Sequence, residues 1–321
     1  MPDQECYYND GTTKVIHIEH HWLITFTSLI LAPLFVLLFS IQGISQITTN
    51  NALPVGEGKG ILRVQHKVIR ATDDPTNANR DLFVQASPVV GVYGLSSRLS
   101  VFGVVPILDK RLLLDTPQKR IRRDSGFGLG DIRLFTRYDI YRNMASGRIF
   151  SISPLAGLEL PTGSDDQRDS FGRLPQPLQR GSGSWDPFTG AVFTYQTLEW
   201  FFDLATTYQV NTEANNFKFG NEYRLDTVVK YRLFPRQLQS GVGGFFYIDL
   251  ESNLIIQDNN QINGSENPDS GGTTLMVAPG LQYITKKFVF ETAVQLPAHQ
   301  DLNGNALEND FITTVSIRMN L

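Results

Sequence analysis

Charged side chains recur at every second position in several segments of this sequence, and their spacing could bind or guide a charged or polar solute. Glu222, Arg224, Asp226, Lys230 and Arg232 share one side of an extended chain, because successive side chains of a strand point to opposite faces. The other side is mostly apolar. Such a set of ionisable groups is out of place in an apolar core, since burying unpaired charges costs free energy. The pattern is typical of a strand with one wet face.

Catalytic chemistry has little support in the sequence. The single cysteine is Cys6, and His66 and His299 are the only histidines after residue 45. Neither histidine has a neighbouring serine motif, whereas a hydrolase needs a nucleophile, a base and an orienting group together. We therefore expect no catalytic residues, with lipid hydrolysis as a distant alternative.

Two segments look like ligand loops but fit them poorly. Residues 126–131 have the sequence GFGLGD, which lacks the lysine and the following helix of a phosphate-binding loop. Residues 301–310 are rich in oxygen ligands, yet Gly304 stands fourth where an EF-hand loop needs its glycine sixth. A solvated turn is favoured over a surface calcium site. We expect no cofactor and no metal.

The composition excludes several classes of protein. Hydrophobic residues make up 41% and charged residues 19% of the 321 residues, and the mean hydropathy is -0.16. These values exclude a polytopic helical membrane protein and a disordered chain. A transmembrane β-barrel fits them, because its alternating strands average to near zero. After residue 45 the chain keeps 27 Lys and Arg against 28 Asp and Glu, which argues against nucleic-acid binding by bulk charge.

A long apolar run lies near the start, where residues 22–39 carry no charge. Small residues before Gln46 suit a signal-peptidase cut, so we predict a cleavable secretory segment over residues 1–45. The alternative is an uncleaved anchor helix. Residues 1–21 hold four acids and one lysine, an unusual n-region that a later translation start would explain. Residues 46–58 would then form a periplasmic lead.

Alternation with a period of two continues to the C-terminus and indicates about twelve strands. They lie near residues 59–71, 82–95, 98–108, 127–141, 148–160, 185–196, 199–210, 218–233, 242–256, 273–284, 287–297 and 310–321. The connections alternate between short and long, as outer-membrane barrels alternate periplasmic turns with extracellular loops. We predict an all-β fold over residues 59–321, a single antiparallel up-and-down transmembrane β-barrel.

Aromatic residues on the apolar faces give an independent indication. Those near the short turns are Tyr138, Tyr195, Trp200, Tyr231, Tyr283 and Phe288. In a barrel their rings would form one belt at a membrane interface. A soluble sandwich or lipocalin-like barrel is the alternative, but it needs neither a belt nor a systematic difference in connection length.

In such a barrel the charged faces line the lumen. The candidate lumen-facing charges are Arg133, Arg137, Asp139, Glu159, Asp203, Glu222, Arg224, Asp226, Lys230, Arg232, Glu291 and Arg318. Their signs are mixed, which argues against a strongly ion-selective pore. They could set the selectivity of a narrow channel, or neutralise one another in a closed lumen.

Three glycine-containing motifs carry a family resemblance. Residues 128–131 have the pattern GxGD, residues 160–163 are LPTG, and residues 181–186 are GSGSWD. In this order and spacing they resemble the transporter-like outer-membrane family named for the phenol meta-degradation pathway. The resemblance covers residues 127–321 and, more weakly, 59–126. It implies a bacterial outer-membrane barrel for uptake of small, often aromatic, compounds. The final residue, Leu321, departs from the aromatic that usually ends such barrels.

We therefore expect a bacterial outer-membrane channel or transporter for uptake or passive diffusion of small solutes. Residues 161–184 are a candidate constriction. The alternative is a non-conducting barrel with a structural or surface-interaction role. The expected partners are the lipid bilayer, lipopolysaccharide, the outer-membrane assembly machinery and small-molecule solutes, with no nucleic acid. The basic run between Lys110 and Arg123 could bind lipopolysaccharide phosphates, or could be a solvated loop.

Overall fold

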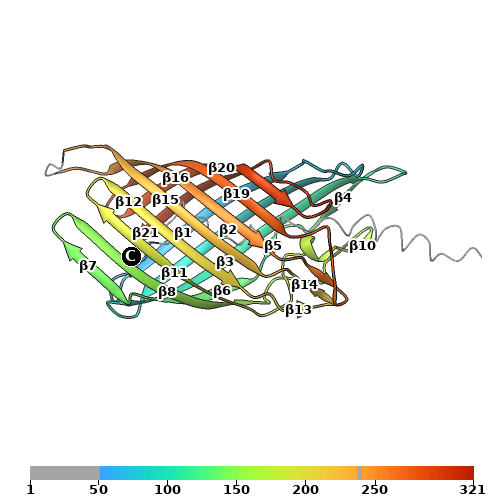
Figure 1. The fold of residues 1–321 in the computed structure, drawn as a ribbon, viewed down its shortest axis with the longest axis horizontal. Coiled ribbons are helices and arrows are strands. Elements are labelled where there is room, and N and C mark those ends of the chain that lie inside the picture. Colours follow the sequence, from blue (N-terminus) through green and yellow to red (C-terminus); the bar gives the residue numbers. More distant parts are fainter. Residues whose placement is uncertain (1–50, 238–240) are drawn as a thin grey trace, which may run out of the picture.

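The computed structural model describes residues 51–237 and 241–321, and twelve long antiparallel strands in it form a closed barrel (Figure 1). The predicted secretory segment, residues 1–45, lies outside the described residues. The strands are β1 (Gly60–Ala71), β2 (Asp81–Gly94), β3 (Leu99–Asp115), β6 (Ile132–Tyr138), β8 (Arg148–Leu160), β11 (Asp186–Thr197), β12 (Trp200–Gln209), β15 (Glu222–Phe234), β16 (Phe245–Gln257), β19 (Gly272–Ile284), β20 (Phe288–Leu302) and β21 (Phe311–Asn320). Each pairs with its neighbours in the chain, and β1 pairs with β21 to close the barrel. The predicted fold class is confirmed.

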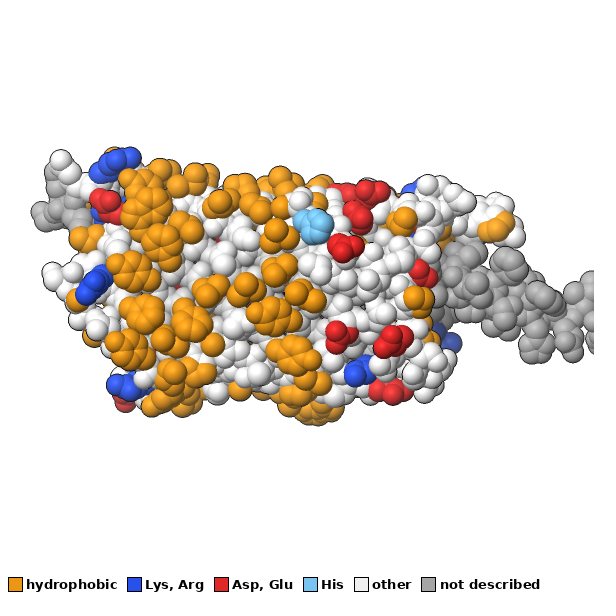
Figure 2. All heavy atoms as spheres, viewed as in Figure 1, with side chains coloured by type: hydrophobic (Ala, Val, Ile, Leu, Met, Phe, Trp, Pro, Cys, Tyr) orange, Lys and Arg blue, Asp and Glu red, His pale blue; other side chains and the backbone are white. Residues whose placement is uncertain are grey.

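The strands form because their alternating residues satisfy two different surroundings. In β15, Arg224, Asp226 and Lys230 are buried on the inner face, while Tyr223 and Val229 are exposed on the outer face. Hydrophobic side chains cover the outer wall from the short-turn end to its middle, and acidic side chains gather toward the other end (Figure 2). An apolar outer band around a polar interior is the pattern of a membrane barrel.

The two ends of the barrel differ as the sequence predicts. Short turns and the C-terminus lie at one end, and longer loops lie at the other (Figure 1). The long-loop end also carries small elements: β4 (Arg120–Asp124), β5 (Gly128–Leu129), β9 (Arg168–Asp169), β10 (Gly172–Arg173), the 3-10 helix η1 (Gln176–Leu178), β13 (Glu213–Ala214), β14 (Phe217–Lys218), β17 (Gln261–Ile262) and β18 (Ser265–Glu266). In the described ranges no helix is long and apolar enough to cross a membrane.

Three strand boundaries differ from the prediction. The third strand continues to Asp115 and pairs with β4, although the sequence analysis ended it at residue 108. Its inner face carries Leu108, Leu112 and Leu114 with Lys110 between them, all buried, while Asp109 and Arg111 fall in the opposite phase. The fourth strand is divided into β5, β6 and β7 (Tyr141–Ala145). The eleventh strand, β20, extends beyond residue 297 to Leu302.

Candidate functional site: the barrel interior

The interior of the barrel wall carries the charges that the sequence analysis singled out. Of the twelve candidates, ten are buried, and Glu222 and Arg318 are half-buried. The buried ten are Arg133, Arg137, Asp139, Glu159, Asp203, Arg224, Asp226, Lys230, Arg232 and Glu291. Charges on the inner wall of a wide pore would be exposed to water. Their burial therefore means that the lumen is narrow.

Two polar networks hold opposite charges together in the lumen. The Nε of Arg224 donates to both carboxylate oxygens of Asp226, at 3.0 and 2.9 Å, and Asn253 Nδ2 donates to Asp226 Oδ1 at 2.7 Å. In the second network, Arg133 Nε lies 3.6 Å from Glu159 Oε2, and Arg133 Nη2 donates to Gln209 Oε1 at 2.9 Å. These pairs join β15 to β16 and β6 to β8 and β12. Opposite signs thus neutralise each other locally.

Buried acids on β16 are absent from the twelve candidates of the sequence analysis. Glu251 of β16 is fully buried, and it lies two residues from Asp249, which is also buried. Both follow the same period of two, and continuing the inner phase through this strand would have found Glu251. Neither carboxylate oxygen of Glu251 has a hydrogen-bond partner among the described residues.

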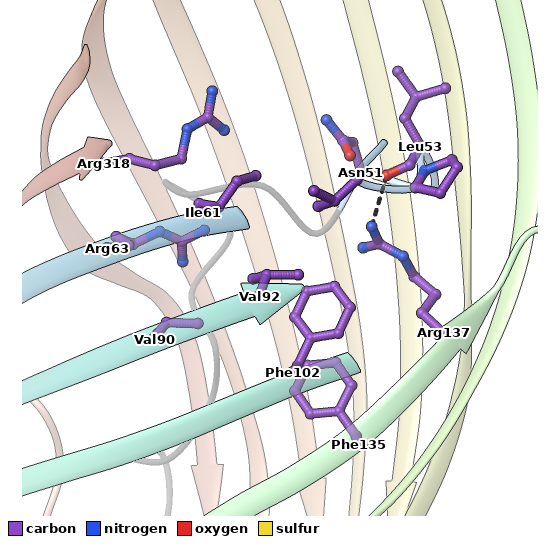
Figure 3. A pocket seen from close by; sticks show the side chains of 12 residues that line it. Asn51, Leu53, Ile61, Arg63, Val90, Val92, Phe102, Phe135, Arg137 and Arg318 are labelled. Atoms are coloured by element: carbon purple, nitrogen blue, oxygen red, sulfur yellow. Dashed lines mark hydrogen bonds between the residues drawn. The ribbon is translucent and has the colours of Figure 1, made fainter. Parts of the chain in front are cut away.

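The segment before β1 folds back into the short-turn end of the lumen. The Ala52 N–H donates to Thr194 Oγ1 at 2.6 Å, and Ser153 Oγ donates to the Ala52 carbonyl at 2.6 Å. Arg137 Nη2 donates to the Leu53 carbonyl at 2.7 Å (Figure 3). The sequence analysis assigned residues 46–58 to a periplasmic lead. The structure places residues 51–55 of that lead among inward-facing side chains.

Residues 161–184 pack into the opposite end of the barrel, the mouth. Leu174 and Leu178 are 2% and 0% exposed, and they belong to one apolar cluster with inward-facing residues of β1, β2 and β3. Lys110 Nζ donates to the carbonyls of Pro177 and Gln179, at 3.1 and 2.6 Å. We call residues 161–184 the mouth plug. The plug and the barrel wall together form an apolar core in the mouth.

The three glycine motifs meet where the mouth plug is anchored. Asp131 Oδ1 accepts a hydrogen bond from the Gly163 N–H at 2.8 Å, and Asp131 Oδ2 accepts from the N–H and the Oγ of Ser182 at 2.6 and 2.8 Å. A Cβ added to Gly181 would collide with the backbone of Gly163. Glycine is needed there because two backbone segments lie in contact. The motifs therefore form one structural joint.

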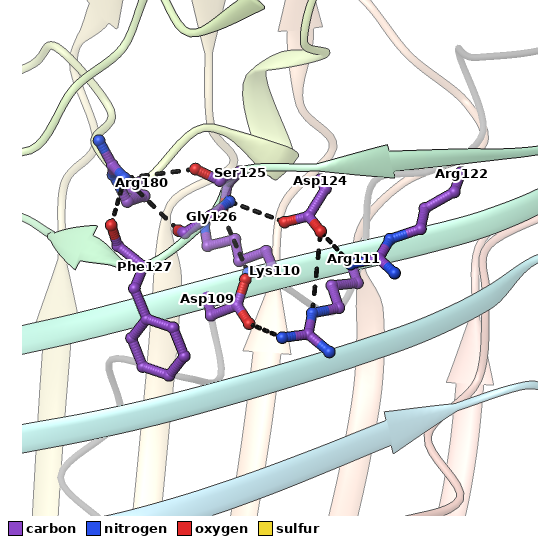
Figure 4. A network of polar contacts seen from close by, with 9 residues as sticks. All are labelled: Asp109, Lys110, Arg111, Arg122, Asp124, Ser125, Gly126, Phe127 and Arg180. Atoms are coloured by element: carbon purple, nitrogen blue, oxygen red, sulfur yellow. Dashed lines mark hydrogen bonds and ion pairs between the residues drawn. The ribbon is translucent and has the colours of Figure 1, made fainter. Parts of the chain in front are cut away.

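The basic run between Lys110 and Arg123 is largely paired within the protein (Figure 4). Arg111 Nη2 donates to Asp109 Oδ2 at 2.5 Å, and Arg122 forms an ion pair with Asp124. Arg123 pairs with Asp169 of the mouth plug. These contacts leave less of the cationic charge available to lipopolysaccharide than the sequence alone indicates.

The two histidines of the described residues do not form a catalytic constellation. His66 faces outward, and its Nδ1 lies 3.0 Å from Ser87 Oγ on the neighbouring strand. No carboxylate pairs with this histidine in the part of the chain that the structure describes. His299 is on β20, beyond residue 297, where the sequence analysis ended this strand. Over the same residues, no three His, Cys, Asp or Glu side chains come together as a metal site.

The predicted aromatic belt residues lie on the outer face near the short turns. Tyr138, Tyr195 and Trp200 are exposed, and Tyr231, Tyr283 and Phe288 are half-buried. Several rings are neighbours: the ring centroids of Trp200 and Tyr231 are 4.4 Å apart. This arrangement fits rings at a lipid–water boundary.

Comparison with known proteins shows which solved structures are similar to this barrel. A COG4313 outer membrane channel from Pseudomonas putida F1 is similar in structure, with a TM-score of 0.61 and 15% identity over 85% of this chain and 99% of that chain. A NanC porin has a TM-score of 0.42 and 12% identity, over 81% and 100%. LpxR from Salmonella typhimurium has a TM-score of 0.40 and 10% identity, over 81% and 99%. A search of curated protein sequences found no match.

The outward apolar band, the closed barrel and the channel-like fold together identify a bacterial outer-membrane protein embedded in the bilayer. A family model described as "Putative MetA-pathway of phenol degradation" matches residues 79–298. The predicted resemblance is therefore confirmed. Because this match spans more than half of the 321 residues, the chain belongs to the family described as "Putative MetA-pathway of phenol degradation".

Proposed function

We propose that this protein is a narrow, hydrated channel for the uptake or passive diffusion of small solutes across the outer membrane. The mouth plug would limit entry, and the lumen charges would set selectivity. The observation that carries this proposal is a set of buried polar atoms in the lumen without hydrogen-bond partners among the described residues. They are Arg137 Nη1, Arg232 Nε, Asp249 Oδ2, both oxygens of Glu251, Glu291 Oε2 and Arg318 Nε.

These atoms support a hydrated interior. A buried polar group without a partner costs about 1 to 3 kcal/mol, and more when it is charged, so native proteins satisfy such groups with ordered water. Cavities with volumes of about 170, 30 and 10 Å³ lie between inward-facing side chains. A barrel interior with water along the wall is what passive movement of a polar solute requires.

The solute class follows from two further points. Mixed charge signs favour small solutes that are neutral or carry few charges over a strongly ion-selective flow. The family description refers to phenol degradation, and the similar structure from Pseudomonas putida F1 is called an outer membrane channel. The family description supports small aromatic compounds as solutes, and the similar structure supports a channel rather than an enzyme.

The second candidate is a barrel that does not conduct and has a structural or surface-interaction role. The burial of ten of the twelve candidate lumen charges favours it, because a lumen without continuous water passes no solute. Reconstitution separates the two functions. The channel function predicts discrete single-channel currents in planar bilayers and solute-dependent swelling of liposomes. If purified, folded protein gives neither current nor swelling, the channel function is wrong.

Two partners belong to the same proposal. The final strand, β21, keeps an outward apolar series that includes Val315 and Ile317, both exposed, so we expect the outer-membrane assembly machinery to recognise it despite Leu321. Lipopolysaccharide would surround the long-loop end. Recognition by the assembly machinery can be tested by crosslinking the unfolded C-terminal strand to the purified machinery. If no crosslink forms, this partner is excluded.

A further inference from the structure

A cavity of the lumen lies between the N-terminal segment and the wall at the short-turn end. It has a volume of about 170 Å³. Its charged lining residues are three arginines, Arg63 of β1, Arg137 of β6 and Arg318 of β21, and no acidic residue of the described ranges lines it. Figure 3 shows Arg63 and Arg318 on one side of the cavity and Arg137 on the other, with Phe102 and Phe135 between them.

The placement of the arginines concentrates positive charge. Arg63 and Arg318 are directly opposite each other on neighbouring strands, and like charges in that position destabilise a sheet. Arg137 is 4% exposed, and its Nη1 has no hydrogen-bond partner among the described residues. The same holds for the buried Nε of Arg318. A bound anion would relieve the repulsion and use these donors.

The carboxylates that act on these arginines lie outside the lining of the cavity. Glu291 acts electrostatically on both Arg63 and Arg318, and Glu251 acts on Arg63 as well, but neither carboxylate lines the cavity. Asp139 acts on Arg137, but Asp139 is already engaged by an ion pair with Arg142. Asp203 also acts on Arg137, and accepts a hydrogen bond from Thr194 Oγ1 at 2.5 Å.

Apart from the three arginines and Asn51, the described side chains that line the cavity are apolar or aromatic. Val90, Val92 and Ile61 line it together with Phe102 and Phe135, whose rings stack with centroids 4.4 Å apart. An apolar cavity of about 150 Å³ can hold benzene, so a volume of about 170 Å³ suits one aromatic ring. The cavity thus joins an apolar wall to a cluster of cationic donors.

We propose that this cavity binds a small organic carboxylate with an apolar, ring-sized body. The carboxylate would lie among Arg63, Arg137 and Arg318, and the ring against the valines and phenylalanines. This inference deepens the proposed function, because it names the class of solute that binds at the short-turn end. The role of the site in permeation rests on the proposed function. Binding itself does not require that the barrel conducts.

Calorimetric titration of the purified protein in detergent tests the site, with benzoate as the probe. Benzyl alcohol has a similar body without the charge, and acetate has the charge without the ring. We expect benzoate to bind at least tenfold more tightly than either compound. Equal affinities for benzoate and benzyl alcohol would show that the arginines do not recognise the anion, and would overturn the proposal.

Matched arginine variants locate the site. Arg318→Gln removes one cationic donor and should weaken benzoate binding about 10- to 100-fold. Arg232→Gln is the control, because Arg232 is also a buried lumen arginine but does not line the cavity. Val92→Phe fills the cavity without changing its charge, and should abolish benzoate binding. This variant still tests the site if Arg318→Gln does not fold. Binding that both Arg318→Gln and Val92→Phe leave unchanged would contradict the proposal.

Conductance recorded on the same preparations separates the two proposals. If the wild-type protein conducts but does not bind benzoate, the anion site is wrong and the channel function stands. If it binds benzoate with the expected Arg318 dependence but never conducts, the site stands and the channel function is wrong.

Discussion

Leu178 lies at the centre of the mouth plug, and its side chain is fully buried in the apolar cluster of β1, β2 and β3. Leu178→Ala removes that buried side chain and leaves a cavity. Substitutions of this kind cost about 2 to 5 kcal/mol. Because Leu178 contacts the wall only while the plug is seated, the cost applies to the seated state and shifts the plug toward release.

The magnitude converts directly into a population. A cost of about 2 kcal/mol raises the fraction of released plug roughly 30-fold, and about 3 kcal/mol raises it roughly 150-fold. Trypsin reports this fraction at Arg180, which is half-buried in the seated plug and donates to the Phe127 carbonyl at 2.8 Å, since cleavage follows the open population when reclosing is fast. The expected result is a 30-fold or greater increase in the cleavage rate at Arg180, in a barrel that remains folded.

The control is Phe171→Ala in the same loop. Phe171 is 46% exposed, and its ring lies near two cationic side chains, with the Lys119 ammonium 5.6 Å and the Arg123 guanidinium 5.8 Å from the ring centroid. We expect less than about a fivefold change in cleavage for this variant. Equal cleavage rates for Leu178→Ala and Phe171→Ala would refute the mouth plug as a packed element. Larger single-channel currents from Leu178→Ala alone would connect plug release to entry.

Three further predictions concern other parts of the barrel. Asp226→Asn leaves the Arg224 charge without its carboxylate in the lumen, and should lower the free energy of unfolding by about 3 to 5 kcal/mol in reversible denaturation. Asp74 lies in the loop after β1: burial raises its pKa, but hydrogen bonds and the charge of Arg80 outweigh burial, so its pKa is below the ordinary value. The stability that Asp74 gives this loop is therefore present above the unfolded pKa, near 3.9, and is lost as pH falls through the folded pKa. The rate of hydrogen exchange at the Arg80 amide should therefore rise in acid. Asp74→Asn should remove this pH dependence. Trp200→Ala removes a belt ring and should weaken folding into lipid bilayers by about 1 to 3 kcal/mol, measured by urea titration in liposomes, whereas no change would place Trp200 outside the interface.

The strands could be predicted because a membrane barrel gives its two faces opposite solvents. In β15 the inner phase of Arg224 and Asp226 and the outer phase of Tyr223 follow from the period of two alone. The extension of β3 was missed because Arg111 and its charged neighbours look like a solvated loop, although Leu112 keeps the inner phase apolar and buried. The charged residues therefore led the sequence analysis to end this strand at residue 108, although it continues to Asp115.

The closure of the lumen could not be predicted, because it depends on contacts between segments far apart in the chain. Residues 161–184 have no periodicity to indicate that Leu174 and Leu178 would be buried against β1 to β3. Hydrogen bonds from the wall position the Ala52 peptide group inside the barrel, and its own sequence gives no sign of that place. The motif residue Asp131 was visible, but its role as an acceptor for Gly163 and Ser182 was not.

The two ends of the interior present different chemistry to a solute that enters from outside. The mouth plug exposes a solute to an apolar cluster around Leu178 once it releases, while the short-turn end presents Arg63, Arg137 and Arg318. An apolar ring is favoured at the first place and a carboxylate at the second. A compound with both features gains free energy at each end, whereas an inorganic anion gains it only near the arginines. Under the proposed function, the order of the two surfaces therefore selects amphiphilic anions over simple ions, without a uniform charge along the lumen.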